Sequence, residues 1–327
     1  MRTSQRSQLY PAITEPSTSP WQHRHILDLD DFTREEMEFL FHTADAMKEI
    51  LSREIKRVPT LRGKTVVTMF YEPSTRTRVS FELAAKSLGA DVTSISAATS
   101  STVKGESLVD TVRTIQALGS DVLVMRHPRS GAPYLVAQQV ASSVVNAGDG
   151  WHAHPTQALV DLYTIRAHRG GVEEAKAVII GDILHSRVAR SNIWGLTTMG
   201  AQVVLCGPPT LLPRFWGQAY PEAIIEPNLE NALADADIVM VLRLQKERQQ
   251  SGLLPSIEEY IRLYQLDERR LALAKPDALV MHPGPMNEGI EIAPGVAHGA
   301  QSVIEEQVAN GVAVRMALLY LLAGGAH

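Results

Sequence analysis

The run Lys64-Thr65-Val66-Val67-Thr68-Met69-Phe70-Tyr71-Glu72-Pro73-Ser74-Thr75-Arg76-Thr77-Arg78 predicts a strand that passes through a short turn into a helix. Residues 64–70 are mostly apolar and β-branched, which is typical of a buried strand. Pro73 fixes an extended entry to the helix, and Gly89 is its expected stop. The apolar side of this helix is expected to comprise Val79, Leu83 and Leu88. A buried strand followed at once by a helix is the repeating unit of parallel α/β sheets.

Segments of strand and helix character continue to alternate along the chain. Thr33 and Glu36 fit a capping box at the start of a first helix. Further helices are predicted at 107–118, 155–168 and 302–322. Further strands are predicted at 91–96, 121–125, 142–146, 176–181, 202–206, 237–242 and 278–281. This alternation predicts the α/β class, with two parallel-sheet, doubly wound domains that are covered by helices and joined by a hinge helix.

The predicted strands fall into two groups on either side of the 155–168 helix, which agrees with about two domains for a chain of 327 residues. We expect a first domain over 23–160 and a second over 161–301, with a C-terminal helix in 302–327 that packs back on the first. Residues 1–20 are rich in Ser, Thr, Gln and Pro and lack the apolar core of a secretory signal. A flexible extension over 1–22 is therefore favoured, while an organelle transit peptide stays open as the alternative.

The overall charge is mildly acidic, because 31 Lys and Arg residues face 36 Asp and Glu residues, for a net charge of −5. Sequence-independent binding to DNA or RNA needs a basic surface, so a nucleic-acid partner is not expected, while small anionic substrates remain open. No segment approaches the ~20 consecutive apolar residues of a membrane-spanning helix. Cys206 is the single cysteine, which excludes an intrachain disulfide and a Cys-rich zinc site and predicts a reducing, cytoplasmic location.

Three local patterns resemble ligand-binding motifs but carry little weight. Gly63-Lys64-Thr65 lacks the glycine that a P-loop needs five residues earlier. Gly148–Ala153 fits the loose GxGxxG/A dinucleotide pattern, but bulky residues fill it and the expected acidic residue is misplaced, so nucleotide binding stays a minor alternative. Two histidine pairs lack a third ligand at a telling spacing, so no metal site is predicted: His23 with His25, and His152 with His154.

The Ser74–Arg78 segment, in contrast, predicts a phosphate site. Ser74, Thr75 and Thr77 fall at a helix N-terminus, where free backbone N–H groups and the positive end of the helix dipole favour an anion. Two guanidinium groups add charge and paired donors. A single hydroxyl here could be an ordinary helix cap, but the whole run of hydroxyl and arginine residues favours phosphate binding.

This run resembles the carbamoyl-phosphate signature of the aspartate and ornithine carbamoyltransferase family. Further family motifs follow in order along residues 23–322: Val103–Glu106, Met125–Pro128, His154–Gln157, Gly181-Asp182 with Ser186–Val188, Arg243–Arg248, and His282–Pro285. The resemblance implies two domains, one for carbamoyl phosphate and one for the amine substrate. It implies no cofactor.

Within the family, the amine half of the site favours aspartate over ornithine. A dicarboxylate needs basic groups, and Arg187, Arg243 and Lys104 occupy matching positions. The ornithine enzymes resemble one another in a His-Cys-Leu-Pro run where this chain has His282–Pro285, and they lack the loop lysine. The resemblance therefore implies transfer of a carbamoyl group to the α-amine of L-aspartate, in pyrimidine biosynthesis. Transfer to ornithine or another amine, or a non-catalytic paralogue, are the alternatives.

The resemblance also implies roles in the carbamoyl phosphate half. The phosphate would be held by one segment, Ser74, Thr75, Arg76 and Thr77. Arg126 would bridge the phosphate and the carbonyl oxygen, and with Thr77 and His154 would stabilise the charge that develops on this oxygen. Gln157 and the backbone carbonyls of Gly284 and Pro285 would accept hydrogen bonds from the carbamoyl NH2 group.

In the aspartate half, the resemblance assigns the α-carboxylate to Arg187 and the β-carboxylate to Arg243, helped by Gln245. Lys104 and Ser100 would come from a neighbouring subunit, because the family forms trimers with shared sites. Whether a regulatory chain or a dihydroorotase partner joins the trimer stays open.

Two positions depart from the family pattern. Glu288 stands where many relatives have Arg, which reverses a charge near the Gly284–Pro285 loop. Val188 replaces a Thr of some relatives and removes a hydroxyl contact to aspartate. A different salt bridge is one explanation for Glu288, and a weaker site is the other.

Overall fold

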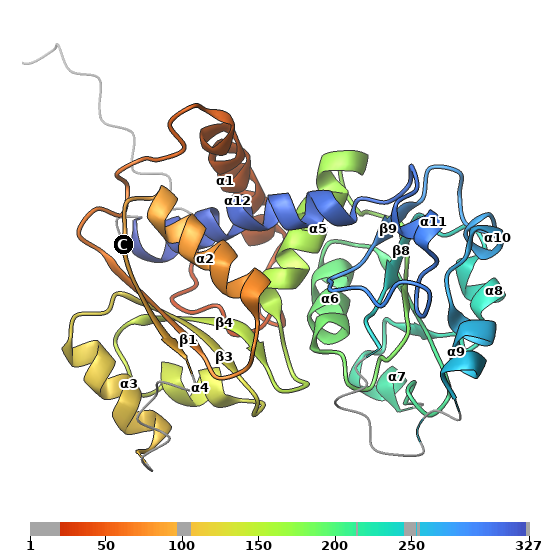
Figure 1. Ribbon diagram of the computed structural model, residues 1–327, viewed down its shortest axis with the longest axis horizontal. Helices are drawn as coiled ribbons and strands as arrows, with labels where there is room; N and C mark the ends of the chain where they lie inside the picture. Colours follow the sequence, from red (N-terminus) through yellow and green to blue (C-terminus); the bar gives the residue numbers. More distant parts are fainter. Residues whose placement is uncertain (1–19, 97–105, 214, 245–252, 254–255, 325–327) are drawn as a thin grey trace, which may run out of the picture.

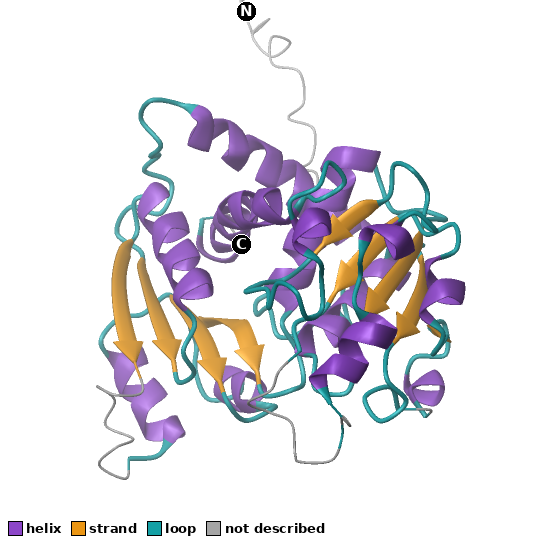
Figure 2. Ribbon diagram, turned by 45° about the vertical axis from the view of Figure 1, so that its right-hand side comes forward, coloured by secondary structure: helices purple, strands orange, loops and turns teal. Residues whose placement is uncertain are grey.

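The computed structural model describes residues 20–96, 106–213, 215–244, 253 and 256–324. The chain forms two parallel sheets, each with helices on both faces, that lie next to each other (Figures 1 and 2). The predicted fold class is therefore confirmed. The strands alternate with helices in sequence, and parallel strands require this because each crossover must return to the same edge of the sheet.

The first sheet has the order β2-β1-β3-β4. Its strands are β1 (Thr65–Phe70), β2 (Asp91–Ser96), β3 (Val122–His127) and β4 (Ser143–Asp149). All four were predicted; β2 matches at both ends, and no end of the other strands differs by more than three residues. β1 lies in the middle of the sheet and is buried from Val66 onward, as its apolar sequence predicts.

The second sheet has the order β7-β6-β5-β8-β9. Its strands are β5 (Lys176–Ile180), β6 (Gln202–Cys206), β7 (Ile224–Ile225), β8 (Ile238–Val241) and β9 (Leu279–Met281). The sequence did not predict β7, which contributes two residues at the edge of the sheet. Strands this short carry no periodicity that a sequence pattern can detect.

Helices cover both sheets and connect them. Beside the first sheet lie α1 (Arg34–Ser52), α2 (Thr75–Ser87), α3 (Leu108–Ala117) and α4 (Ala132–Ala137). The connecting helix is α5 (Pro155–Arg169). Around the second sheet lie α6 (Arg187–Thr198), α7 (Trp216–Ala219), α8 (Leu229–Leu233), α9 (Ile257–Tyr264), α10 (Glu268–Leu271) and α11 (Pro294–Ala297). The last helix is α12 (Ile304–Ala323).

Local sequence signals explain where these helices begin and end. The capping box of α1 is present, since Thr33 accepts from the Glu36 backbone and the Glu36 carboxylate accepts from the Thr33 N–H. Gly170 ends α5 in the left-handed conformation, with φ of 78°. The predicted apolar side of α2 is wrong in part, because Val79 and Leu83 are exposed. The helix instead packs against the core with Phe81 and small residues.

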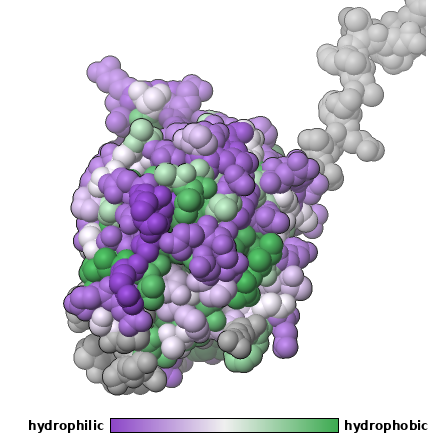
Figure 3. All heavy atoms as spheres, turned by 90° about the vertical axis from the view of Figure 1, so that its right-hand side faces the viewer, coloured by the Kyte–Doolittle hydropathy of each residue, from purple (hydrophilic) through white to green (hydrophobic). Residues whose placement is uncertain are grey.

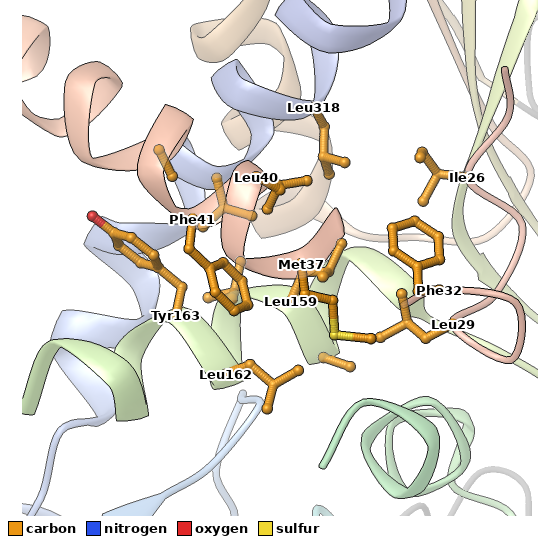
Figure 4. Packing of buried hydrophobic residues seen from close by; sticks show 14 of the residues in the cluster. Ile26, Leu29, Phe32, Met37, Leu40, Phe41, Leu159, Leu162, Tyr163 and Leu318 are labelled. Carbon is orange, nitrogen blue, oxygen red and sulfur yellow. The ribbon is translucent and has the colours of Figure 1, made fainter. Parts of the chain in front are cut away.

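Helix α12 leaves the second sheet and packs back on the first domain, against α1 and α2, as the sequence predicted (Figure 1). Figure 4 shows the resulting core, in which Phe41 of α1, Leu159 of α5 and Leu318 of α12 meet. Each such fully buried side chain contributes about 1.5–3 kcal/mol of transfer free energy. The core thus joins helices that are far apart in the sequence.

The N-terminal part of the described chain also packs on this core. Trp21 is only 6% exposed and lies edge-on to Phe32. The prediction of a flexible extension over 1–22 is therefore wrong at Trp21, and its residues 1–19 lie outside the described residues.

The end of the second domain has a mostly hydrophilic surface. Figure 3 looks onto the end of the second domain, where hydrophilic side chains cover most of the face and smaller apolar areas lie between them. No helix of the described chain combines the length and apolar character needed to cross a membrane.

Candidate active site

In each sheet there is a switch point, where successive connections from one strand lead to opposite sides of that strand. Both switch points face one cavity. In the first sheet, the chain moves from β1 to β2 on one side and to β3 on the other. In the second, β5 has β6 on one side and β8 on the other. Open parallel sheets leave a crevice at the carboxyl ends of such strand pairs, where ligands bind. The segments that follow β1, β3, β5 and β8 are therefore the expected ligand contacts.

A cavity of about 830 Å³ lies at this place, between the two sheets. Eleven of the predicted site residues line it: Ser74, Thr75, Arg76, Thr77, Arg126, His154, Gln157, Arg187, Arg243, Gly284 and Pro285. These residues, up to 211 positions apart in the sequence, thus meet around one space large enough for small substrates. Ser100, Lys104 and Gln245, the other predicted site residues, lie outside the described residues.

The N-terminus of α2 opens into the cavity without a side-chain cap. Ser74 occupies the N-cap position but makes no capping hydrogen bond. Ser186, at the start of α6, does accept from the Ala189 backbone in the usual way. The first turn of α2 therefore keeps N–H donors and three hydroxyl groups available to an anion.

Arg76 connects this helix end to the second domain. Its Nη1 donates to the carbonyl oxygen of Pro283 at 3.0 Å. The next residue, Gly284, has φ of 61°, and a Cβ atom there would collide with the Arg76 guanidinium. Glycine is thus required both by the backbone conformation and by the close approach of Arg76.

Glu72 places a carboxylate between two arginines of the cavity. Its Oε2 lies 3.3 Å from Arg126 Nε and 3.0 Å from Arg187 Nη1. Arg187 also donates to the Gly150 carbonyl at 3.2 Å, and its side chain is almost fully buried. One acid of the first domain therefore orients one arginine from each domain, a role that sequence analysis did not assign to Glu72.

His154 lies at the start of α5 with its ring buried in the cavity wall. Burial first, and the positive charges of Arg187, Arg126 and Arg315 next, lower the pKa of His154 well below its usual value. The imidazole is therefore neutral near pH 7. Its backbone N–H donates to Ser191 Oγ at 3.0 Å, which ties it to α6. A neutral ring in this place can donate one hydrogen bond to a carbonyl oxygen.

The 282–285 loop is held by the ring of His282. The Gly284 N–H donates to His282 Nδ1 at 2.8 Å, so the proton of a neutral ring must be on Nε2. Nε2 lies 3.3 Å from the buried carboxylate of Glu291. Burial lowers the pKa of His282, and the hydrogen bond and charge of Glu291 only partly oppose this shift. These contacts fix the loop that presents Gly284 and Pro285 to the cavity.

Two further residues that line the cavity, both on α12, were missed in the sequence. Arg315 of α12 lines the cavity, stacks its guanidinium 5.1 Å from the Phe81 ring, and has its pKa lowered to about 10 by burial. Gln307 of α12 also lines the cavity, and it donates to the buried carboxylate of Asp161 on α5. Only the return of α12 to the first domain brings these groups to the site.

The motifs set aside in the sequence have structural explanations. A Cβ atom at Gly148 would lie 2.8 Å from Cζ of Arg187, and one at Gly150 would collide with Ser130, so both glycines are needed for packing inside the protein. Glu288 pairs with His298 at 3.4 Å, and Glu288 is not among the residues that line the cavity. Among the described residues, no three His, Cys, Asp or Glu side chains are grouped so that they could hold a metal ion.

These observations define a class: a two-domain α/β protein whose arginine-rich cavity lies where the carboxyl ends of two parallel sheets meet. Two domain descriptions of a single protein family match the chain. Residues 24–167 match the carbamoyl-P binding domain of the aspartate/ornithine carbamoyltransferases, and residues 173–322 match their Asp/Orn binding domain. The chain belongs to the aspartate/ornithine carbamoyltransferase family.

Individual relatives are similar over nearly their whole length. The aspartate carbamoyltransferase catalytic subunit of Chloroflexus aggregans is 63% identical over 305 residues, which cover 93% of this chain and 99% of that protein. That of Dehalococcoides mccartyi is 59% identical, covering 96% and 97%.

Solved structures agree. Aspartate transcarbamoylase of Trypanosoma cruzi with N-(phosphonacetyl)-L-aspartic acid has a TM-score of 0.82 at 32% identity, covering 91% of this chain and 95% of that one. Ornithine carbamoyltransferase of Pyrococcus furiosus has a TM-score of 0.83 at 29% identity, covering 93% and 98%. The fold similarity is thus equal for both branches of the family, and it does not separate aspartate from ornithine as the amine.

Proposed function

We propose that this chain transfers the carbamoyl group of carbamoyl phosphate to the α-amine of L-aspartate, giving N-carbamoyl-L-aspartate and phosphate. The observation that carries the proposal is the composition of the cavity. The first domain contributes an uncapped helix N-terminus with hydroxyl groups and Arg76, and the second contributes Arg187 and Arg243. This places a phosphate cradle opposite two groups suited to a dicarboxylate. The relatives at 59–63% identity carry the same activity in their names.

In this proposal the domains divide the substrates between them. The region 23–160, together with α12, binds carbamoyl phosphate, and 161–301 binds aspartate. The family descriptions support this division apart from α12, because a carbamoyl-P domain matches 24–167 and an Asp/Orn domain matches 173–322, which includes this helix. The packing of α12 on α1 and α2 supports assigning this last helix to the first domain.

The reaction forms a C–N bond between the neutral amine and the carbonyl carbon, and the C–O bond to phosphate then breaks. The amine proton leaves with the phosphate. Thr77, Arg126 and the neutral His154 donate to the carbonyl oxygen as it gains negative charge. Removal of one such donor typically raises the barrier by about 2.7–4 kcal/mol.

The remaining groups bind and orient the two reactants. Ser74, Thr75 and Arg76 hold the phosphate, and Gln157 accepts from the carbamoyl NH2 group with the carbonyls of Gly284 and Pro285. Arg187 takes the α-carboxylate, while Arg243 and Gln245 take the β-carboxylate. Two reactants held at attack distance need no covalent enzyme intermediate and no cofactor.

The test is a side-by-side assay of carbamoyl transfer to L-aspartate and to L-ornithine. We expect transfer to L-aspartate, with a kcat/KM at least about 100-fold above that for L-ornithine, because a cationic side chain would face Arg243. Preference for ornithine would show that the chain works in the other branch of the family. No transfer to any amine by the purified protein would favour a non-catalytic paralogue.

We further propose a homotrimer in which Ser100 and Lys104 enter the site of a neighbouring subunit. The exposed apolar side chains of Val79 and Leu83 on α2, the helix whose N-terminus lines the cavity, support a subunit contact at this helix. The single cysteine, Cys206, which is buried, supports a reducing, cytoplasmic location. The mass of the native assembly tests the trimer and reveals a regulatory chain or dihydroorotase partner if one co-purifies.

A further inference from the structure

Asp161 is a buried carboxylate for which the reaction proposed above has no direct use. It lies on α5 one turn after Gln157, and its side chain has no exposed surface. Burial raises the pKa of this carboxyl to about 6, although three hydrogen bonds oppose the shift. Ionised carboxylates are costly to bury and are retained where their hydrogen bonds are all used.

The three hydrogen bonds come from three helices. Gln157 Nε2 on α5 donates to Oδ1 at 2.9 Å, and Gln307 Nε2 on α12 donates to the same oxygen at 2.8 Å. Asn192 Nδ2 on α6 donates to Oδ2 at 2.9 Å. Every partner is a side-chain amide that presents its NH2 group to the carboxylate.

This arrangement fixes the direction of the Gln157 amide. A carboxylate can only accept hydrogen bonds, so the Gln157 NH2 group must face Asp161 and the amide oxygen must face away from it. Gln157 is part of the cavity wall, and its oxygen is thus the atom left for a ligand. At this position the Gln157 side chain therefore presents a hydrogen-bond acceptor to the cavity and not a donor.

The same logic extends through Gln307 to the 282–285 loop. Because the NH2 group of Gln307 is used by Asp161, its oxygen accepts, and it receives the backbone N–H of His282 at 3.0 Å. His282 begins the loop that brings Gly284 and Pro285 to the cavity. Asp161 is therefore linked to both sets of groups that were assigned to the carbamoyl NH2.

We propose that Asp161 is a positioning residue that makes the site selective for the NH2 group of carbamoyl phosphate, by orienting Gln157 directly and the 282–285 loop through Gln307. The inference rests on the proposed function, and it adds the residue that sets donor selectivity. Without this carboxylate, the Gln157 amide can rotate and present its NH2 group to the cavity. Two hydrogen-bond donors, this group and the NH2 group of the substrate, would then face each other, and no hydrogen bond could form between them.

The first test is Asp161→Asn, which keeps the shape but replaces one acceptor oxygen with an NH2 group. We expect kcat/KM for carbamoyl phosphate to fall by about 10- to 100-fold, the usual effect of a mismatched buried polar contact. The inhibition constant of inorganic phosphate, which has no NH2 group, should stay within about twofold. The preference for carbamoyl phosphate over acetyl phosphate, which carries CH3 in place of NH2, should shrink.

Thr164→Val is the matched control. Thr164 Oγ1 accepts from Asn310 Nδ2 at 3.1 Å, a buried hydrogen bond between the same two helices, α5 and α12, one turn further along α5. We expect this variant to lower the thermal midpoint and to keep the wild-type preference for carbamoyl over acetyl phosphate. If it loses that preference as Asp161→Asn does, the effect is general loosening of the helices and the inference is wrong.

A double mutant separates positioning from structure. In a Gln157→Ala background, Asp161→Asn should cost less activity than in the wild type, because part of its effect runs through Gln157. Fully additive losses would overturn the inference. If Asp161→Asn does not fold, Gln307→Met removes the link between Asp161 and His282 and keeps the hydrogen bond between Gln157 and Asp161. This variant should weaken the binding of carbamoyl phosphate and leave that of phosphate unchanged.

The outcomes for the inference and for the proposed function differ. A wild-type protein that transfers no carbamoyl group contradicts the proposed function. An active wild type, with an Asp161→Asn variant that loses phosphate and carbamoyl phosphate affinity equally, leaves the function in place and overturns the role of Asp161.

Discussion

His154 is neutral in the folded protein because burial and three nearby arginines lower its pKa well below 6.5. An unfolded chain, in contrast, binds a proton at this residue as the pH falls through about 6.5. The free energy of unfolding therefore falls with decreasing pH in this range, by about 1.4 kcal/mol per pH unit once the unfolded histidine is fully protonated. We predict that His154→Gln weakens this dependence between pH 7.5 and 5.5, measured by urea unfolding at fixed protein concentration.

His152 provides a control of opposite sign. Its hydrogen bond to Asp149 raises the pKa of His152 above the usual value. The contribution of this hydrogen bond to the free energy of unfolding is present at low pH and is lost as the pH rises through the pKa of His152 in the folded protein. His152→Gln should therefore steepen the loss of stability on acidification. If both variants change the pH dependence in the same direction, the electrostatic assignment of His154 is wrong.

Glu72 is expected to matter for aspartate although it has the same charge as the substrate. Its carboxylate holds Arg187 at 3.0 Å, and loss of a hydrogen bond between charged groups costs about 1.5–3 kcal/mol. We predict that Glu72→Gln raises the KM for L-aspartate by about tenfold or more at saturating carbamoyl phosphate. Glu173→Gln, which removes an exposed ion pair with Arg34, should leave this KM unchanged. An unchanged KM in Glu72→Gln would contradict the positioning of Arg187 by Glu72.

At the scale of elements, the 282–285 loop and the C-terminus of α5 offer a matched pair of glycines. Gly284 and Gly170 both have positive φ, so alanine costs about 1 kcal/mol at either position. Only at Gly284 would the new Cβ atom meet the Arg76 guanidinium, while nothing lies within 4 Å at Gly170. We predict that Gly284→Ala lowers kcat/KM for carbamoyl phosphate by about 10- to 100-fold and that Gly170→Ala does not. Similar activities in the two variants would contradict the contact.

The fold could be predicted from the sequence wherever a segment carries its own periodicity. Long apolar strands such as Thr65–Phe70 and the capped helix Arg34–Ser52 are clear in the pattern. The two-residue strand Ile224–Ile225 is not, because its pairing with β6 gives it its structure. The exposed Val79 and Leu83 show a second limit of prediction from sequence. An apolar stripe on a helix does not show whether the stripe packs against the core of its own chain or lies on the surface.

The site could be predicted where a motif keeps its residues close together, as in Ser74–Thr77. Glu72 stood beside this motif, but only the fold reveals that its carboxylate meets Arg187, 115 residues later in the chain. Asp161 and Gln307 are 146 residues apart and have no common motif. Their pairing depends on α12 packing back against α5, which local sequence does not encode.

At the scale of the whole molecule, the division of charges between domains predicts closure. The helix N-terminus of α2 lies in the first domain, whereas Arg187 and Arg243 belong to the second. A molecule that carries both a phosphate-like group and a dicarboxylate contacts both and should draw the domains together. We predict a smaller radius of gyration by X-ray scattering with a bisubstrate analogue than with phosphate alone. Identical curves would contradict closure.

The proposed trimer predicts complementation between inactive variants. Lys104→Gln removes a group that one subunit lends to its neighbour, and Arg243→Ala removes a group from the subunit's own site. Mixed trimers should contain sites that lack neither group, so mixing two inactive proteins under conditions of subunit exchange should restore part of the activity. The control is each variant mixed with itself. Exchange shown by mass spectrometry without recovered activity would contradict the shared site.

The return of α12 to the first domain also bears on the order in which the protein is made. All strands of the second sheet, up to Met281, leave the ribosome before residues 304–323. The first domain needs this helix to cover α1 and α2, so a nascent chain that already contains the whole phosphate cradle still exposes their apolar faces. The second domain can therefore complete its sheet before α12 is available to cover α1 and α2 of the first.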